Sequence, residues 1–343
     1  MRKTAGRCAV SMSAAAALLA ACGGSQPPIV PGAMPQSRAA AEPADRGRSW
    51  MLPEAKSKDL LYVVYPTQAS EGYIDAYSYP QGVLEGQITG LSNPGGDCTD
   101  ASGDVYVTNG DPSGHSIVEF AHGGTKPIRT LLEPGTNPFS CAVDPANGDL
   151  AVTNYGTSAG QGASIAVYRK AKGKPRIYTD SNFLNYAYCT YDNADDLFVD
   201  GKYPGGYETP IVAELPHGGK SLLTLNLNDE IGWLSGVQWD KKYLAVGQAI
   251  KPYILRFRIS GTTGTLVGST PLTDATDAFQ FVFARNKVIV ANVWFYDRYE
   301  FETDVLVYNY PRGGNSTQRI AYKIGGSELD SVALSPKPQN GLR

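Results

Sequence analysis

Histidine is the first side chain to consider for acid–base chemistry, and the 343-residue sequence contains only three. His122 and His217 occupy the same place in two matching motifs, AHGG and PHGG, which predict turns. A residue repeated in equivalent turns points to a structural role. His115 stands in a predicted loop without a carboxylate nearby in the sequence. We find neither a GxSxG nucleophile elbow nor an HExxH motif, and we predict no catalytic residue.

A set of oxygen-bearing side chains at equivalent positions of a repeated segment is the better candidate. A turn residue marks the end of one strand in each copy, and the six markers are Asp100, Asp144, Asp192, Asp240, Ala284 and Ser335. The position seven residues earlier holds Asn93, Asn137, Asn185, Trp233, Asp277 and Glu328. The strands that follow the markers end with Asn109, Asn154, Asp200 and Asn292. Copies arranged around one axis would gather these side chains on one rim as a ligand-binding site; alternatively, the Asn residues only form turns.

Three acids would lie nearest such an axis. Asp277, Glu328 and Asp330 come from the last two copies, and carboxylates are preferred ligands of calcium. The enzymatic alternative therefore predicts that these three residues hold a divalent cation such as calcium. This cation site is the only chemical support in the sequence for that alternative.

Three cysteines, Cys98, Cys141 and Cys189, lie in the first strands of successive copies. Cys98 is two residues before its marker, whereas Cys141 and Cys189 are three before theirs, so strand alternation turns Cys98 to the opposite face. The mismatched faces disfavour a metal site made of three thiolates, and we expect small buried apolar residues between blades rather than a bridge. An odd number of cysteines still permits one disulfide and one free thiol.

The elements that must position these residues are short strands. Segments such as NPFSCAVDPANGDLAVTN, from Asn137, repeat with markers about 44 to 51 residues apart, a spacing typical of four-stranded propeller blades. Asp59–Tyr65 resembles a second strand without a first, and Ser331–Ser335 a first strand without a second. Joining them completes one blade and leaves no large open edge. The sequence predicts an all-β, six-bladed β-propeller over residues 59–343.

The pattern PxGxxxD…GxLxVTN, represented by residues 138–154, resembles an NHL repeat and places the chain among NHL and gluconolactonase-like propellers. In the lactonases of this group, the resemblance implies a metal held by a Glu, an Asp and two Asn. Those ligands lie closer to the strand, where this chain has Gly95, Phe139, Ala187, Ser235, Phe279 and Asp330. Only Asp330 suits a metal. The fold also carries lyases and binding modules, so fold does not decide activity.

The N-terminus predicts export. Arg2, Lys3 and Arg7 precede an Ala-rich apolar run at residues 9–21, which is too short to span a membrane. The sequence LAAC at its end resembles a bacterial lipobox, which implies cleavage before Cys22 and lipidation of that residue. Residues 1–21 are then a signal peptide, and residues 22–58 are a Pro- and Ala-rich tether. The expected location is the cell envelope, lipid-anchored and outside the cytoplasm.

Charge excludes some partners. Cleavage would remove three of the 30 Lys and Arg residues and none of the 33 acids, leaving a net charge of about −6, which argues against nucleic acid or anionic lipid as a partner. We expect a monomeric, membrane-tethered module that binds a protein or glycan through the rim without catalysis. The alternative is a metal-dependent lactonase-type hydrolase or lyase that uses the same funnel.

Overall fold

The computed structural model describes residues 47–66, 71–111, 114–135, 137–157, 160–204, 209–229, 231–232, 235–248, 252–295, 301–324 and 329–338. Cys22, Trp233 and Glu328 lie outside these residues, as does the side chain of Asp277. Among the described residues, no helix has the length and apolar character needed to cross a membrane.

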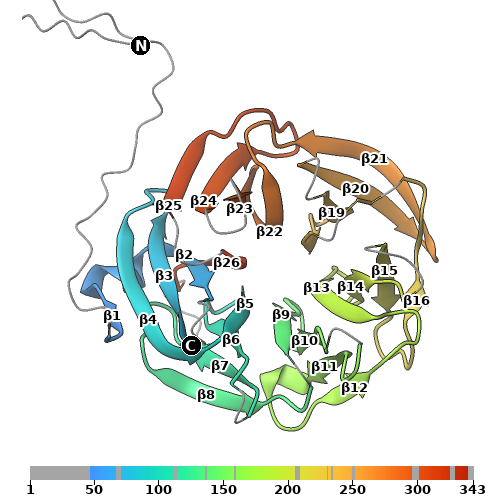
Figure 1. Ribbon diagram of the computed structural model, residues 1–343, viewed down its shortest axis with the longest axis horizontal. Helices are drawn as coiled ribbons and strands as arrows, with labels where there is room; N and C mark the ends of the chain where they lie inside the picture. The colour runs from blue at the N-terminus through green and yellow to red at the C-terminus, as the bar shows by residue number, and fades with distance from the viewer. Residues whose placement is uncertain are drawn as a thin grey trace, which may run out of the picture. The chain divides into compact units, whose positions relative to one another are not determined.

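Six sheets stand around a common centre, and the prediction of a six-bladed β-propeller is confirmed (Figure 1). Blade 1 contains β26 (Ser331–Ser335), β2 (Asp59–Tyr65), β3 (Glu71–Tyr79) and β4 (Leu84–Ser92), with β1 (Trp50–Met51) on its outer edge. Blade 2 contains β5 (Pro94–Thr99), β6 (Val105–Asn109), β7 (Ser116–Phe120) and β8 (Pro127–Leu132). Blade 3 contains β9 (Pro138–Val143), β10 (Leu150–Asn154), β11 (Ser164–Tyr168) and β12 (Arg176–Tyr178).

The other three blades follow the same order from the centre outward. Blade 4 contains β13 (Asn185–Tyr191), β14 (Leu197–Lys202), β15 (Pro210–Leu215) and β16 (Leu223–Thr224). Blade 5 contains β18 (Val237–Trp239), β19 (Leu244–Gln248), β20 (Tyr253–Ser260) and β21 (Thr263–Pro271), with β17 (Asn226–Leu227) parallel to β21. Blade 6 contains β22 (Asp277–Ala284), β23 (Lys287–Phe295), β24 (Phe301–Asn309) and β25 (Gln318–Ile324). Two short 3-10 helices, η1 (Pro53–Ser57) and η2 (Arg169–Ala171), complete the described elements.

The two ends of the chain close the ring as the sequence predicts. Strand β2 pairs antiparallel with β26 from Leu60↔Ser335 to Val64↔Ser331. Blade 1 therefore takes its innermost strand from the C-terminus and its outer strands from the N-terminal part. The closure joins residues more than 260 positions apart and leaves the innermost strand of blade 1 paired.

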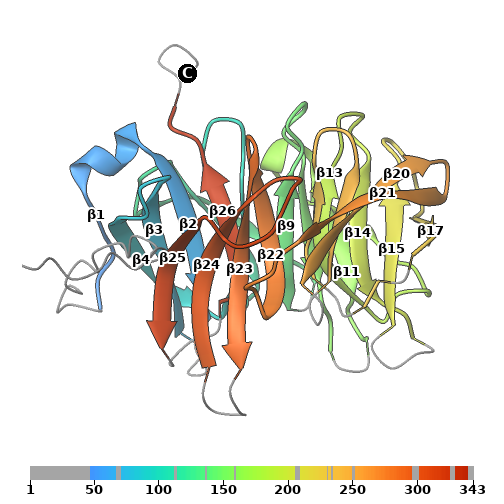
Figure 2. The same ribbon diagram turned by 90° about the horizontal axis from the view of Figure 1, so that it is seen from above.

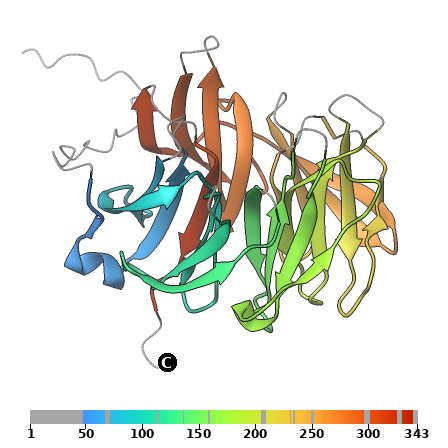
Figure 3. The same ribbon diagram turned by 60° about the horizontal axis from the view of Figure 1, so that its bottom comes forward.

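The strands run between two faces of the ring, which the side and tilted views separate (Figures 2 and 3). We call the side with the turns between first and second strands, marked by Asp100, Asp144, Asp192 and Asp240, the hairpin face. The opposite side, where the innermost strands begin at Pro94, Pro138 and Asn185, is the entry face.

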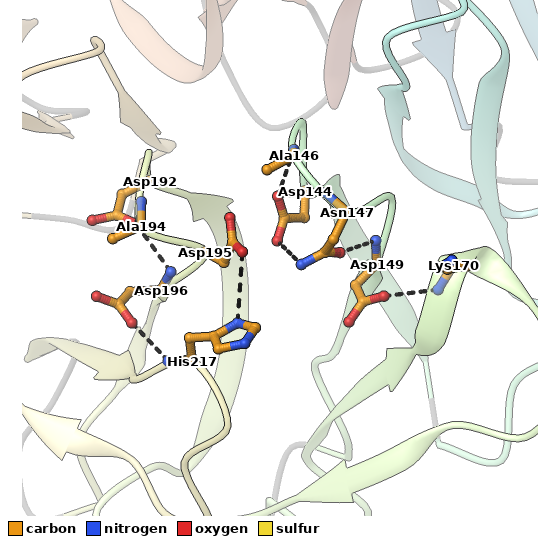
Figure 4. Close-up of polar contacts among 10 residues, drawn as sticks. All are labelled: Asp144, Ala146, Asn147, Asp149, Lys170, Asp192, Ala194, Asp195, Asp196 and His217. Atoms are coloured by element: carbon orange, nitrogen blue, oxygen red, sulfur yellow. Dashed lines mark hydrogen bonds and ion pairs between the residues drawn. The ribbon is translucent and has the colours of Figure 1, made fainter.

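The marker acids form the hairpin turns. In blade 3, Asp144 Oδ1 accepts the backbone N–H of Ala146 at 2.8 Å, and in blade 4, Asp192 Oδ1 accepts that of Ala194 at 2.7 Å (Figure 4). A carboxylate that bonds the backbone two residues onward is an Asx turn. The repeated acid is thus a local device that reverses the chain.

Apolar residues pack between neighbouring blades. The cluster between blades 2 and 3, for example, contains Cys98 and Tyr106 from one and Leu150 and Val152 from the other. Each blade therefore buries both faces of its sheet, and the second strands are almost continuously apolar.

The expectation that the cysteines are unbridged is wrong for two of them. Cys98 and Cys141 form a disulfide between β5 and β9, with Cα atoms 5.6 Å apart. Their opposite orientations are what a bridge between successive blades requires, because one residue must face forward and the other backward. Cys189 is free and buried. Ala142, the counterpart of Cys98 in blade 3, packs against the same hydrophobic cluster, and a second bridge would need a cysteine at that position.

Candidate functional site

The entry face begins with the two exposed residues Asn93 and Asn137. Both have left-handed backbone, with φ of 46° and 58°, a conformation that Asn tolerates better than most residues. Their carbonyl oxygens accept the N–H groups of Gly110 at 3.2 Å and Tyr155 at 3.0 Å. The backbone of Asn93 and Asn137 therefore supports the alternative that these residues form turns. The amide side chains of Asn93 and Asn137 are exposed, and ligand binding by these two side chains stays a prediction.

Asn109, Asn154 and Asn292 make a repeated junction at the ends of the second strands. Asn109 Oδ1 accepts the N–H of Ser92 at 2.7 Å, and Asn292 Oδ1 accepts that of Thr276 at 2.8 Å. Asn109 and Asn154 each donate through Nδ2 to the serine opposite on the third strand, and Asn292 donates to Asp304. Asn154 and Asn292 are fully buried, so these bonds hold the strands and their preceding loops together.

Asp200 belongs to a different repeated position. It corresponds to Thr108 and Thr153, whose hydroxyls accept the inner-strand N–H groups of Gly96 and Ser140. Asp200 Oδ1 accepts the N–H of Tyr188 at 2.6 Å in the same way, and burial raises the pKa of its carboxyl well above the usual range. Asn185 is also buried, and its Oδ1 accepts the N–H of Lys202 at 3.1 Å.

Aromatic rings gather near the centre of the entry face. Phe139 at the start of β9 lies 5.4 Å from Tyr155 and 5.3 Å from Tyr188, between ring centroids, and we call these three residues the aromatic cluster. Lys202 places its ammonium 5.9 Å from the Tyr155 ring centroid. Phe139 and Tyr155 are half-buried, so their rings remain accessible, whereas Tyr188 is buried.

Asp330 immediately precedes β26 of blade 1, and its N–H donates to the carbonyl oxygen of Val64 at 3.3 Å. Burial raises the pKa of the Tyr188 hydroxyl, and the negative charge of Asp330 adds to that effect. The position equivalent to Asp330 holds Gly95, Phe139, Ala187, Ser235 and Phe279 in the other blades. This set does not fit the Glu, Asp and two Asn of the lactonases. Among the described residues, no group of three His, Cys, Asp or Glu side chains could hold a metal ion.

The histidines have the structural surroundings expected for turn residues. His122 Nδ1 lies 2.6 Å from Ser335 Oγ, and its Nε2 lies 3.0 Å from the carbonyl oxygen of Lys58. Burial lowers the pKa of His122, which favours the neutral ring. His217 is exposed and lies 3.8 Å from Asp195 on the hairpin face (Figure 4).

A buried carboxylate near His115 was missed by sequence analysis. Glu133 Oε1 accepts hydrogen bonds from Gly135 N at 2.9 Å and Asn154 Nδ2 at 3.1 Å, and Oε2 accepts one from Tyr168 Oη at 2.7 Å. Its backbone N–H also donates to the carbonyl oxygen of His115 at 2.9 Å. Three donors on one carboxylate make Glu133 a junction between blades 2 and 3.

Residues 156–160, GTSAG, match the GxSxG pattern of hydrolase nucleophiles, although the sequence analysis found no such elbow. The segment connects β10 to β11 and contains a turn in which Gly160 N donates to the carbonyl oxygen of Thr157 at 2.8 Å. A nucleophile elbow instead requires a strand followed by a helix. Ser158 itself lies outside the described residues, and the setting of the motif does not support a hydrolase.

Comparison with known proteins supports the fold. No protein-family model matches the chain, and no curated protein matches it. A chain of a nidogen/laminin complex shares the architecture with a TM-score of 0.60 at 14% identity, covering 81% of this chain and 100% of that chain. A protein of unknown function from Bacteroides caccae has a TM-score of 0.55 at 10% identity, covering 81% and 99%. At such identities the shared property is the propeller fold, and the NHL resemblance stays a prediction.

Proposed function

We propose that this protein is a lipid-anchored propeller of the cell envelope that binds a protein or glycan through its entry face without catalysis. The observation that supports the proposal is the aromatic cluster, with Lys202 beside the accessible ring of Tyr155. Aromatic faces with an adjacent polar or charged group suit both sugar rings and protein side chains. The exposed amides of Asn93 and Asn137 would add hydrogen bonds on the same face.

The test is a binding screen with the mature protein, using a glycan array and a panel of envelope proteins. Tyr155→Ala removes the accessible ring, and we expect the affinity of each captured ligand to fall about tenfold, the usual worth of an aromatic contact. Tyr178→Ala is the matched control, because Tyr178 is also half-buried beside a cation, Arg176, but lies on outer strand β12. Equal binding by wild type and Tyr155→Ala would refute a site at the aromatic cluster.

Calcium distinguishes the enzymatic alternative. If Asp277, Glu328 and Asp330 hold a divalent ion, added calcium should raise the melting temperature by mass action, and the triple Ala variant should lose that effect. No shift with calcium, together with ligand binding in the presence of a chelator, would favour the binding module. The anchor has a separate test: Cys22→Ser should move the protein out of the membrane fraction or leave it unprocessed.

A further inference from the structure

A group of cations lies on blade 5, at its hairpin-face end and away from the entry face. Arg256 and Arg258 are two residues apart on β20 and so lie on the same side of the sheet. Tyr243, just before β19, lies between them and Lys242. Its ring centroid is 5.1 Å from Lys242 Nζ, 5.8 Å from Arg258 Cζ and 6.0 Å from Arg256 Cζ. We call Lys242, Arg256 and Arg258 the basic cluster.

These cations differ from others that lie against the sheets. Lys58, Arg129, Arg319 and Lys323 each form an ion pair with a buried carboxylate, at distances from 2.6 to 3.2 Å. No carboxylate in the described part of the chain forms an ion pair with the basic cluster. The acid nearest along the chain, Asp240, is already engaged, because it accepts hydrogen bonds from the N–H groups of the turn and from Tyr310 Oη at 2.6 Å.

The cluster also has an unused donor and a supported geometry. Arg256 Nε is buried and has no hydrogen-bond partner. The guanidinium lies over Gly268 of β21, where an added Cβ would come within 2.5 Å of Nη2, and its Cζ is 5.9 Å from the Tyr310 ring centroid. Packing against a glycine and two rings holds the planar group in place, and a preorganised guanidinium binds oxyanions well.

Tyr243 shows that the local potential favours an anion. Hydrogen bonding from Arg258, and then from Lys242, lowers the pKa of its hydroxyl from the ordinary value of 10.0. The other tyrosines with a resolved shift have a raised pKa, with burial as the main cause. Three converging cations therefore create a positive region on a chain that is acidic overall.

We propose that the basic cluster is a binding site for a phosphate-bearing ligand, separate from the entry-face site. Three cations match a doubly charged tetrahedral oxyanion better than a single carboxylate, and Arg258 and Lys242 are exposed enough to reach it. The phosphate could belong to a free phosphorylated molecule or to a lipid headgroup. The contacts needed are the same, so the test separates the two sources.

The first experiment measures thermal stability and calorimetric binding of the mature protein with inorganic phosphate and pyrophosphate, against chloride at equal ionic strength. We expect phosphate to raise the melting temperature, pyrophosphate to raise it further, and Arg258→Gln to weaken binding about tenfold or more. Arg176→Gln is the matched control, because Arg176 is a single arginine lying 4.9 Å from the ring centroid of Tyr178. Equal phosphate binding by wild type and Arg258→Gln would overturn the proposal.

The second measurement uses Tyr243 as a reporter. Titration of tyrosinate absorbance should show one phenol that ionises below the others and is absent in Tyr243→Phe. Saturating phosphate should raise its pKa, because a bound anion disfavours the phenolate. Vesicles of phosphatidylglycerol and of phosphatidylcholine identify the source of the phosphate group. Tighter binding to phosphatidylglycerol vesicles than to pyrophosphate indicates a lipid headgroup. Tighter binding to pyrophosphate indicates a soluble phosphorylated molecule. No binding to phosphate, pyrophosphate or vesicles, with no change in Tyr243, would refute the site.

Discussion

Asp97 should be protonated in the folded protein up to about pH 7, and hydrogen counting gives the reason. The Ser331 hydroxyl contacts both Asp97 Oδ1 and Gln280 Oε1, linking blades 2, 1 and 6. Gln280 Oε1 must be an acceptor, because it also takes the N–H of Val332 at 3.2 Å. Ser331 has one hydrogen and donates it to Gln280, so its contact with Asp97 needs a hydrogen from the carboxyl group. An ionised Asp97 would bring two acceptors together.

The burial of Asp97 also favours the protonated carboxyl group. Asp97 is fully buried, its Oδ2 has no hydrogen-bond partner, and burial raises the pKa of its carboxyl from 3.8 to about 7. A shift of about three units corresponds to about 4 kcal/mol, an upper value for what ionisation of this group costs the folded state. Between pH 4 and 7 the folded protein keeps a proton that the unfolded chain releases. The contribution of Asp97 to stability is therefore complete below pH 4 and is lost as pH rises through 7.

Asp97→Asn tests this reasoning. The amide Nδ2 supplies the hydrogen that Ser331 Oγ needs and does not ionise. We expect the variant to match wild type within about 1 kcal/mol at pH 4, where the carboxyl is protonated in both states. At pH 8 the variant should be more stable by up to about 4 kcal/mol. The measurement is urea unfolding at several pH values, compared as the difference between the two proteins so that contributions of other acids cancel.

Two further variants complete the test. Asp149→Asn removes one negative charge on the hairpin face and keeps an acceptor for the N–H of Lys170, so it reports the effect of net charge. Ser331→Ala leaves the Asp97 side chain without its hydrogen-bond partner and removes one of the two donors to Gln280 Oε1, and it should destabilise at every pH by about 1–3 kcal/mol. A difference between Asp97→Asn and wild type that does not change from pH 4 to pH 8 would show that Asp97 is not protonated as argued.

Three other predictions concern the construction of the ring. Ala142→Cys should form a second bridge with Cys189, because these two positions correspond to Cys98 and Cys141. Thiol titration of the denatured, unreduced mature protein should then find no free thiol in the variant, compared with one in the wild type. Two free thiols in the variant would contradict the register. Replacing Cys98 and Cys141 by Ala should cost about 4 kcal/mol in chemical unfolding, from the entropy of a closed loop with a sequence separation of 43, whereas an unchanged midpoint would argue against the bridge. Truncation after Lys323 removes β26 and should give an aggregated protein in light scattering; a soluble product with a cooperative melt would mean that closure is dispensable.

The sequence determined the fold because its signals are local and repeat. The marker acids, the glycine turns and the apolar second strands each act within one blade, where sequence distance and spatial distance agree. The unmatched strands Asp59–Tyr65 and Ser331–Ser335 predicted closure, since an unpaired inner strand would expose an edge. Even the misjudged cysteines were placed on the correct faces of their strands.

Only the tertiary structure decided what meets across two blades. The bridge between Cys98 and Cys141 needs opposite faces, because neighbouring sheets stand face to face around the ring. The contacts of Asp97 with Ser331, and of Phe139 with Tyr188, join strands whose facing residues depend on how the blades are rotated about the axis. A repeat spacing sets the number and order of blades but leaves that rotation open. The candidate site and the buried acid therefore follow from packing between blades.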